Sequence, residues 1–247
     1  MNLKPAFSTW FVAAWVTTFL VGVKSQPLAG GSLDPLLIPK YVEPLTIPPV
    51  LYDDNGGANP LDVEIAFRQF DQQVLPAPFP MTTLWGYGNP ADPGTFSNPS
   101  FTIEVTKDVP SKIKWTNDLV DGNGYYLQHI LQAANPDPNG PEKVPIVDQT
   151  LHWAAPNGGC KFPEKTQDCV GTDPNPYFGP IPMTVHVHGA HVGPGSDGYP
   201  ESWWLPNARD IPAGYATEGT YYESETGCVA GQGCAVDEYT NDQPTSK

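Results

Sequence analysis

The alternation of apolar and polar residues along this chain predicts several short β-strands and no long helix. Residues 61–70, LDVEIAFRQF, alternate between the two kinds of side chain, and shorter runs of the same character occupy residues 101–107, 111–115 and 183–188. A two-residue period is that of a strand with one buried face. Prolines and turn-forming residues separate these runs and leave no helix-period stretch of useful length. The pattern therefore predicts an all-β fold, an antiparallel sandwich or barrel.

The first residues carry a different pattern, that of a removable leader. Lys4 precedes an apolar run of about 17 residues, and the small side chains of Val23 and Ser25 suit the positions that a signal peptidase reads. We expect residues 1–25 to be a secretory signal peptide, so that the protein is secreted. A signal anchor is the alternative, because the run is at the short edge of what crosses a bilayer as a helix.

The rest of the chain divides into an arm and one domain. Six prolines among residues 27–50 predict a proline-rich, extended arm over residues 26–60. Residues 61–247 have the length of one domain. Aromatic residues make up 11% of the chain, which is enough for a hydrophobic core despite 30 prolines and 24 glycines.

The charge balance limits the partners. The chain has 27 Asp and Glu against 12 Lys and Arg, a net charge of −15. Such an acidic chain repels nucleic acid and anionic membrane surfaces. We therefore expect no nucleic-acid partner, and no membrane partner after removal of the signal.

The four cysteines form an even set, which in an exported protein favours disulfides. We expect local pairing of Cys160 with Cys169 and of Cys228 with Cys234. The alternative is a zinc site, which the spacings disfavour because neither pair has the close C-x2-C spacing and no histidine lies beside them.

Most of the candidate chemistry lies in residues 183–204, MTVHVHGAHVGPGSDGYPESWW. Alternate residues of a strand point to one face, so His186 and His188 would lie side by side, about 6.5 Å apart at the backbone. Paired imidazoles suit copper, zinc or iron. The alternative is that both histidines simply line a polar face, and for His191 we favour a surface residue or an outer hydrogen-bond partner over a ligand.

These residues resemble a known metal motif. His186–Gly189 followed by Ser196–Trp203 is similar to the first copper motif of multicopper oxidases, in the branch of spore-coat laccases and bilirubin oxidases. Six further segments resemble the same branch in the same order. They are residues 33–35, 38–42, 83–87, 102–105, 114–119 and 148–154.

The resemblance implies a cupredoxin-like, plastocyanin-like Greek-key β-sandwich, the first of three in a full-length oxidase. Such enzymes take electrons from a small phenolic or pyrrolic donor and reduce dioxygen to water with copper cofactors. It implies His186 as a ligand of the type 2 copper and His188 as a ligand of a type 3 copper.

The sequence also departs from the family pattern. A trinuclear cluster of this family takes four H-x-H pairs, whereas this chain has one pair and no histidine after His191. Residues 239–245 resemble the lead-in to the next ligand strand, so we expect a sandwich that is incomplete at its C-terminal end. The expected function is that of a fragment of a secreted multicopper oxidase, inactive alone. The alternatives are a non-catalytic copper-binding or structural protein, and a cupin-like mononuclear metal site.

Three further groups offer weaker chemistry. His129 and His152 are isolated in the long connection, where we expect structural or surface roles. Asp197 and Glu201 could pose as a carboxylate pair of a glycoside hydrolase. Gly198 and Pro200 between them predict a turn instead.

Overall fold

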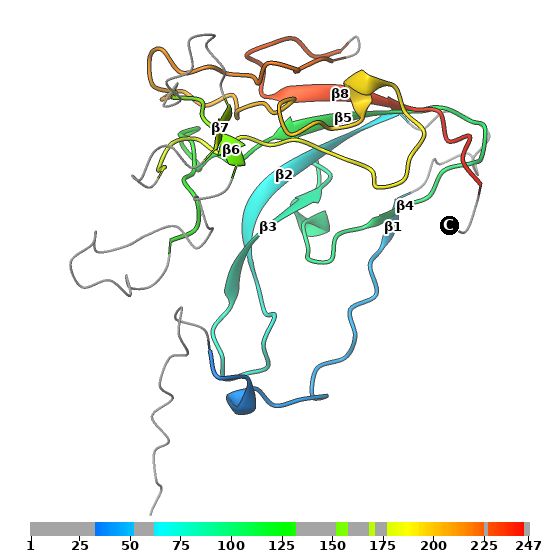
Figure 1. Ribbon diagram of the computed structural model, residues 1–247. Helices are drawn as coiled ribbons and strands as arrows, with labels where there is room; N and C mark the ends of the chain where they lie inside the picture. Colours follow the sequence, from blue (N-terminus) through cyan, green and yellow to red (C-terminus); the bar gives the residue numbers. More distant parts are fainter. Residues whose placement is uncertain are drawn as a thin grey trace, which may run out of the picture. The chain divides into compact units, whose positions relative to one another are not determined.

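The computed structural model describes residues 33–51, 62–131, 152–157, 168–170, 177–224 and 227–244 (Figure 1). Contacts divide the chain into two units, residues 1–37 and residues 38–247. The described part of the first unit holds the 3-10 helix η1, Pro35–Leu37. A side-chain oxygen of Asp34 accepts a hydrogen bond from the backbone N–H of Leu36 at its start.

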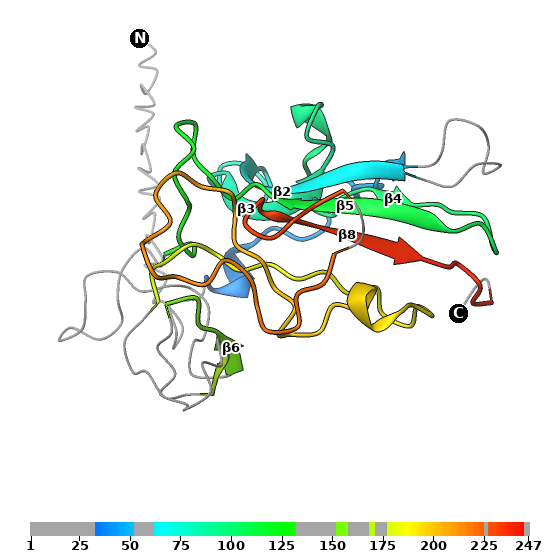
Figure 2. The same ribbon diagram turned by 90° about the horizontal axis from the view of Figure 1, so that it is seen from above.

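The second unit is built on a mixed four-stranded sheet in the order β3-β2-β5-β8. The strands are β2, Asp62–Gln72; β3, Thr82–Gly88; β5, Ser111–Asn117; and β8, Cys234–Tyr239. β2 pairs antiparallel with β3 and parallel with β5, and β5 pairs antiparallel with β8. The view from above in Figure 2 shows β2, β5 and β8 side by side.

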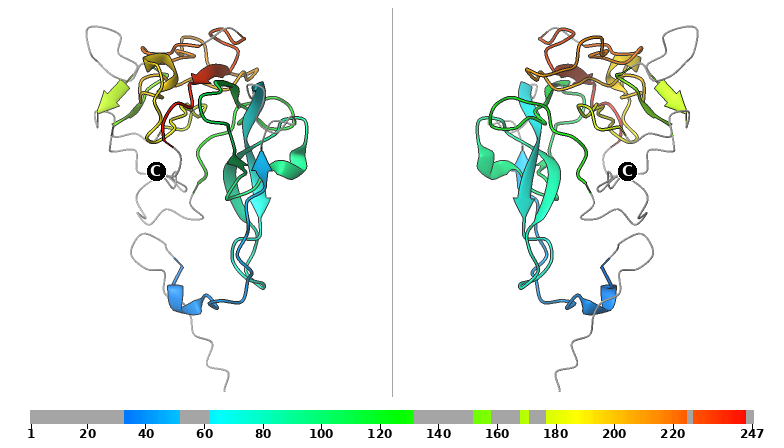
Figure 3. Two further views of the ribbon diagram at one scale, coloured as in Figure 1. Left: turned by 90° about the vertical axis from the view of Figure 1, so that its right-hand side faces the viewer. Right: turned by 90° about the vertical axis from the view of Figure 1, so that its left-hand side faces the viewer.

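Two small sheets complete the regular structure. β1, Val50–Leu51, pairs in parallel with β4, Thr102–Ile103, and β6, His152–Ala154, pairs antiparallel with β7, Asp168–Val170. Figure 3 shows residues 177–224, in yellow to orange, gathered on the β8 side of the four-stranded sheet. This segment includes the histidine pair.

The core follows from the two-residue period of the strands. Along β5 every second residue is buried, and Ile113 and Trp115 supply the apolar part of that face. The ring of Phe67 in β2 stacks on Trp115 with centroids 5.9 Å apart, and Tyr87 in β3 meets Trp115 edge-on at 6.1 Å. The buried residues of this cluster are Ile65, Phe101, Ile113, Trp115, Trp204, Ala235 and Tyr239.

The all-β fold predicted from the pattern is confirmed: all regular elements of the described residues are strands or three-residue 3-10 helices, and the open mixed sheets are consistent with a cupredoxin-like β-sandwich. The strands predicted at residues 61–70 and 111–115 are present. The strand predicted at residues 101–107 is reduced to two residues. The sheet is mixed where the pattern favoured an antiparallel one, because β5 adds to β2 in parallel.

The prediction of a strand at residues 183–188 is wrong. Met183 pairs with Trp204 through two hydrogen bonds of 2.9 Å, but this is an isolated bridge and no ladder continues beyond it. The physical reason is what packs against the residues after Met183. The turn at Gly198, rather than another strand, lies against the backbone of Val185. The segment is extended without being part of a sheet.

Among the described residues, no helix has the length and apolar character needed to cross a membrane. The expected signal peptide, residues 1–25, lies outside the described residues, as do residues 26–32 and 52–60 of the expected arm.

Candidate metal centre

The two histidines of the H-x-H motif lie side by side, as their spacing predicts. The ring centroids of His186 and His188 are 5.9 Å apart, with 44° between the ring planes. Both side chains are exposed. Val185 packs against the core cluster, whereas Val187 is 40% exposed. The pair therefore presents two accessible imidazoles from one short extended segment.

The orientation of the first imidazole is fixed by a main-chain acceptor. Nδ1 of His186 lies 2.5 Å from the carbonyl oxygen of Asp197. A carbonyl oxygen only accepts hydrogen bonds, so Nδ1 is the donor, and in the neutral ring Nε2 then keeps its lone pair. The carboxylate of Asp197 is farther away, with Oδ1 at 3.6 Å from Nδ1. His186 is thus in the tautomer that offers Nε2 to a metal.

His191 is engaged elsewhere. Its Nδ1 lies 3.2 Å from Oδ1 of Asp242, and its backbone carbonyl accepts a hydrogen bond of 2.7 Å from the hydroxyl of Thr240. Both contacts lead to the segment that follows β8. This fits the outer, non-ligating role expected for His191.

Within the described ranges, no three His, Cys, Asp or Glu side chains are grouped so that they could hold a metal ion. The donor set here is two imidazoles. Neutral imidazole is a ligand that copper accepts well, and the free Nε2 of His186 is suited to that role. The described residues therefore fit part of a copper site, with two of its ligands.

A cavity of about 740 Å³ lies between the core-facing side of β5 and the histidine segment. His186 and His191 are among the residues that line it. The rest of its lining is mainly apolar and includes Tyr87, Phe101, Ile113 and Trp115.

The remaining candidate residues are His129, His152 and the carboxylate pair of Asp197 and Glu201. His129 is half-buried beside Trp85, with ring centroids 5.7 Å apart, and burial lowers the pKa of its imidazole. The side chain of His152 lies outside the described residues. Gly198, between Asp197 and Glu201, has a φ of +74°, as expected of a turn.

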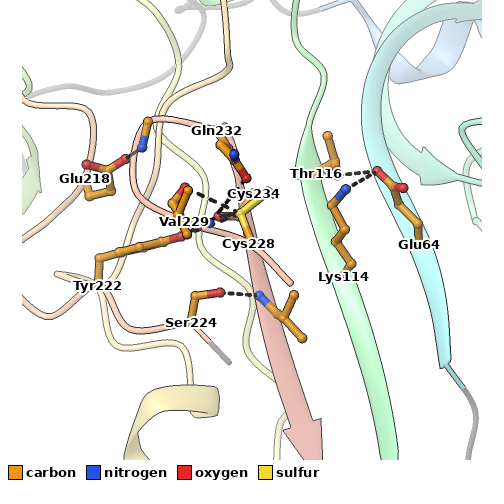
Figure 4. The surroundings of a disulfide bond; sticks show 12 residues. Glu64, Lys114, Thr116, Glu218, Tyr222, Ser224, Cys228, Val229, Gln232 and Cys234 are labelled. Carbon is orange, nitrogen blue, oxygen red and sulfur yellow. Dashed lines mark hydrogen bonds and ion pairs between the residues drawn. A yellow bond between two sulfur atoms is a disulfide. The ribbon is translucent and has the colours of Figure 1, made fainter. Parts of the chain in front are cut away.

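One of the two expected local disulfides, between Cys228 and Cys234, is present. Cys228 and Cys234 are joined, with Cα atoms 6.0 Å apart, at the start of β8 (Figure 4). Tyr222 donates a hydrogen bond of 2.6 Å to the carbonyl of Cys234, and the backbone N–H of Val236 donates one of 3.0 Å to the hydroxyl of Ser224. These sulfurs are therefore not thiolate ligands. The expected partner of Cys169, Cys160, lies outside the described residues.

A buried carboxyl group that was not predicted lies in β8. Asp237 is 4% exposed, and burial raises its pKa to about 7. Tyr239 donates a hydrogen bond of 3.3 Å to Oδ2 of Asp237 and accepts one of 3.1 Å from Nε1 of Trp115. The available signal was the alternation in residues 234–239, which places Asp237 on the same face as Ala235 and Tyr239.

The chain is similar to curated laccases. It is 27% identical to a laccase of Haloferax volcanii over 176 residues, which cover 70% of this chain and 23% of the relative. It is 24% identical to a laccase of Bacillus subtilis over 190 residues, or 77% of this chain and 28% of the relative. With a laccase of Bacillus stratosphericus the identity is 27% over 186 residues, or 75% and 26%.

No protein-family model matches the chain. The chain spans about a quarter of the length of the curated relatives that it matches.

Proposed function

Because this chain is related to the multicopper oxidases, we propose that His186 and His188 supply two imidazole ligands to a copper centre of an oxidase of that family. The observation that carries the proposal is the geometry of the pair. The rings are 5.9 Å apart and exposed, and the proton of His186 is held at Nδ1 so that Nε2 is free.

In this proposal the copper, when bound, supplies the electron transfer that links a reducing substrate to dioxygen. The substrates are a phenolic or pyrrolic electron donor and dioxygen, and the product of oxygen reduction is water. His186 contributes Nε2 while the carbonyl of Asp197 keeps the proton on the opposite side of the ring. In the neutral ring this division of roles selects the tautomer whose Nε2 can bind a metal.

A second candidate is that this chain binds copper without oxidising a donor. The composition of the site favours it, since the described residues offer two imidazoles and no third ligand beside them. Cys228 and Cys234, the cysteines of the second unit whose bonding is described, are joined to each other. An electron-transfer site of the blue-copper type takes a cysteine thiolate, which a disulfide does not provide.

The proposal is tested by titrating the purified chain with Cu(I) and with Cu(II). We expect binding that weakens at least about tenfold in His186→Ala and in His188→Ala, a loss at the lower end of that caused by disturbing a metal site. His191→Ala is the matched control. It removes an exposed imidazole from the same segment, and this imidazole is paired with Asp242. Equal losses in all three variants would show that copper binds histidine non-specifically.

The same preparation tests whether this chain oxidises a donor by itself. We expect no copper-dependent oxidation of a phenolic dye by this chain alone, because electron entry and dioxygen reduction need more ligands than two imidazoles. Robust oxygen consumption by the purified chain would contradict this expectation.

We further propose that the protein is exported and that its leader is removed after Ser25. The proposal is supported by the charged start, the apolar run and the small residues of the leader. N-terminal sequencing of the secreted product tests it directly. A mature product that begins at Met1 would contradict it.

A further inference from the structure

The turn that follows η3, Pro194–Ser196, approaches the histidine segment more closely than a side chain would allow. Gly198 has a φ of +74°, and a Cβ built on it would lie 1.8 Å from the carbonyl oxygen of Val185 and 3.0 Å from Cα of His186. These contacts are with backbone atoms, which cannot rotate away. Glycine is therefore required at this position for two reasons: the backbone has a left-handed conformation, and there is no room for a Cβ atom.

The close approach has a direct consequence for the imidazole. Asp197 precedes Gly198, and its carbonyl oxygen accepts the 2.5 Å hydrogen bond from Nδ1 of His186. The distance of 3.6 Å from Nδ1 to the Asp197 carboxylate is longer than a hydrogen bond. The main chain of the turn, rather than the side chain of Asp197, therefore orients the ring.

Ser196, at the start of the turn, is hydrogen-bonded to the sheet. Ser196 is buried, and its hydroxyl accepts a hydrogen bond of 3.0 Å from the backbone N–H of Glu238 in β8. The backbone N–H of Asp197 in turn contacts the carbonyl of Pro194 at 3.4 Å. The acceptor for His186 is thus held between β8 and the segment that carries the histidines.

We propose that Gly198 is the positioning residue of the metal centre, because it lets the turn close on Val185 and His186 and so places the Asp197 carbonyl at Nδ1. The inference rests on the proposed function only in taking Nε2 of His186 as the ligand atom. The orientation of the ring itself is a property of the metal-free chain.

The first test is the tautomer of His186 in the metal-free chain with isotope-labelled histidine. Two-bond proton–nitrogen correlation spectra, at about pH 8 where free imidazole is neutral, report which ring nitrogen carries the proton. We expect Nδ1 in the wild type and in Asp197→Ala, which keeps the main-chain acceptor. We expect Gly198→Ala to lose this preference.

Gly214→Ala is the matched control for the strain of a left-handed alanine. Gly214 has a φ of +88°, and an added Cβ there meets no atom within 4 Å. It should keep the wild-type tautomer of His186. If Gly198→Ala does not fold, the wild type and Asp197→Ala still decide the matter: a proton on Nε2 in the wild type, or its move to Nε2 in Asp197→Ala, would overturn the proposal.

Copper titration then separates this inference from the proposed function. We expect the dissociation constant to rise about 10- to 100-fold in Gly198→Ala, the effect of removing a partner that orients a ligand, and to stay unchanged in Gly214→Ala. If no variant binds copper while the tautomers follow the expected pattern, the copper function fails and the positioning role stands. If Gly198→Ala binds copper as the wild type does and keeps its tautomer, the positioning role is refuted.

Discussion

Asp237 makes the stability of this fold depend on pH in a direction opposite to that of most carboxylates. Its side chain is 4% exposed in β8, opposite Ile113 of β5, and its described side-chain hydrogen-bond partner is the hydroxyl of Tyr239. Burial disfavours the charged form. The pKa of Asp237 is thereby raised from 3.8 to about 7.

The sign follows from the protons bound in each state. Below about pH 4 the carboxyl of Asp237 is protonated in both the folded and the unfolded chain, so it adds no pH dependence. Between about pH 4 and about pH 7 the unfolded chain releases this proton and the folded chain retains it, so the free energy of unfolding falls as the pH rises. A pKa difference of about three units for Asp237 corresponds to about 4 kcal/mol in total.

Asp237→Asn tests this reasoning, because asparagine has the shape of the protonated acid and does not ionise. Urea unfolding should give similar free energies for variant and wild type at about pH 4. At about pH 8 the variant should be more stable by up to about 4 kcal/mol. Glu238→Gln is the matched control on the same strand: its carboxylate is half-exposed, 3.8 Å from Lys112, and should change stability by less than about 1 kcal/mol. A difference between Asp237→Asn and wild type that stays constant with pH would refute a buried proton at this position.

Two further substitutions test what holds the segments around the site. Replacing Cys228 and Cys234 by alanine opens a loop whose ends are 6 residues apart, so urea unfolding should show a loss of about 2 kcal/mol, and reductant should affect this variant less than the wild type. Asn117→Ala should cost about 2–4 kcal/mol, because the buried amide of Asn117 donates hydrogen bonds of 2.8 and 3.1 Å to the carbonyls of Ile181 and Trp204, which would lose this partner. A loss below about 0.5 kcal/mol in calorimetry would contradict that account.

The strands that could be predicted are those whose polar positions face solvent. In β5 the alternating lysines are half-exposed and the residues between them are buried, so the period is visible in the sequence. β8 was missed because two adjacent acids, Asp237 and Glu238, interrupt its apolar run at the end of a Gly-rich stretch. The alternation groups Asp237 with Ala235 and Tyr239, but it does not show that this face is buried. That depends on Tyr239 and on the neighbouring β5, which only the folded chain brings together.

The histidine pair could be predicted because its two members are neighbours in sequence, and an extended backbone of any kind puts residues i and i+2 on one side. The hydrogen-bond acceptor of His186 could not be predicted from the sequence. The Asp197 carbonyl comes from the main chain, which carries no mark in the sequence, and it lies 11 residues further along. The sequence signal that could have indicated it is Gly198, which was interpreted only as a turn.

The missing ladder at residues 184–188 changes how the two proposed metal ligands, His186 and His188, are held. A strand within a sheet would be fixed by backbone hydrogen bonds on both sides, whereas this segment is fixed at its start by the Met183–Trp204 pair and further on by the turn at Gly198. A hydrogen bond from the backbone N–H of Glu238 to the hydroxyl of Ser196 connects this turn to β8. The orientation of His186 therefore depends on the edge of the sheet that carries the buried Asp237, and a change that loosens β8 should reach the ligand before it unfolds the rest of the sheet.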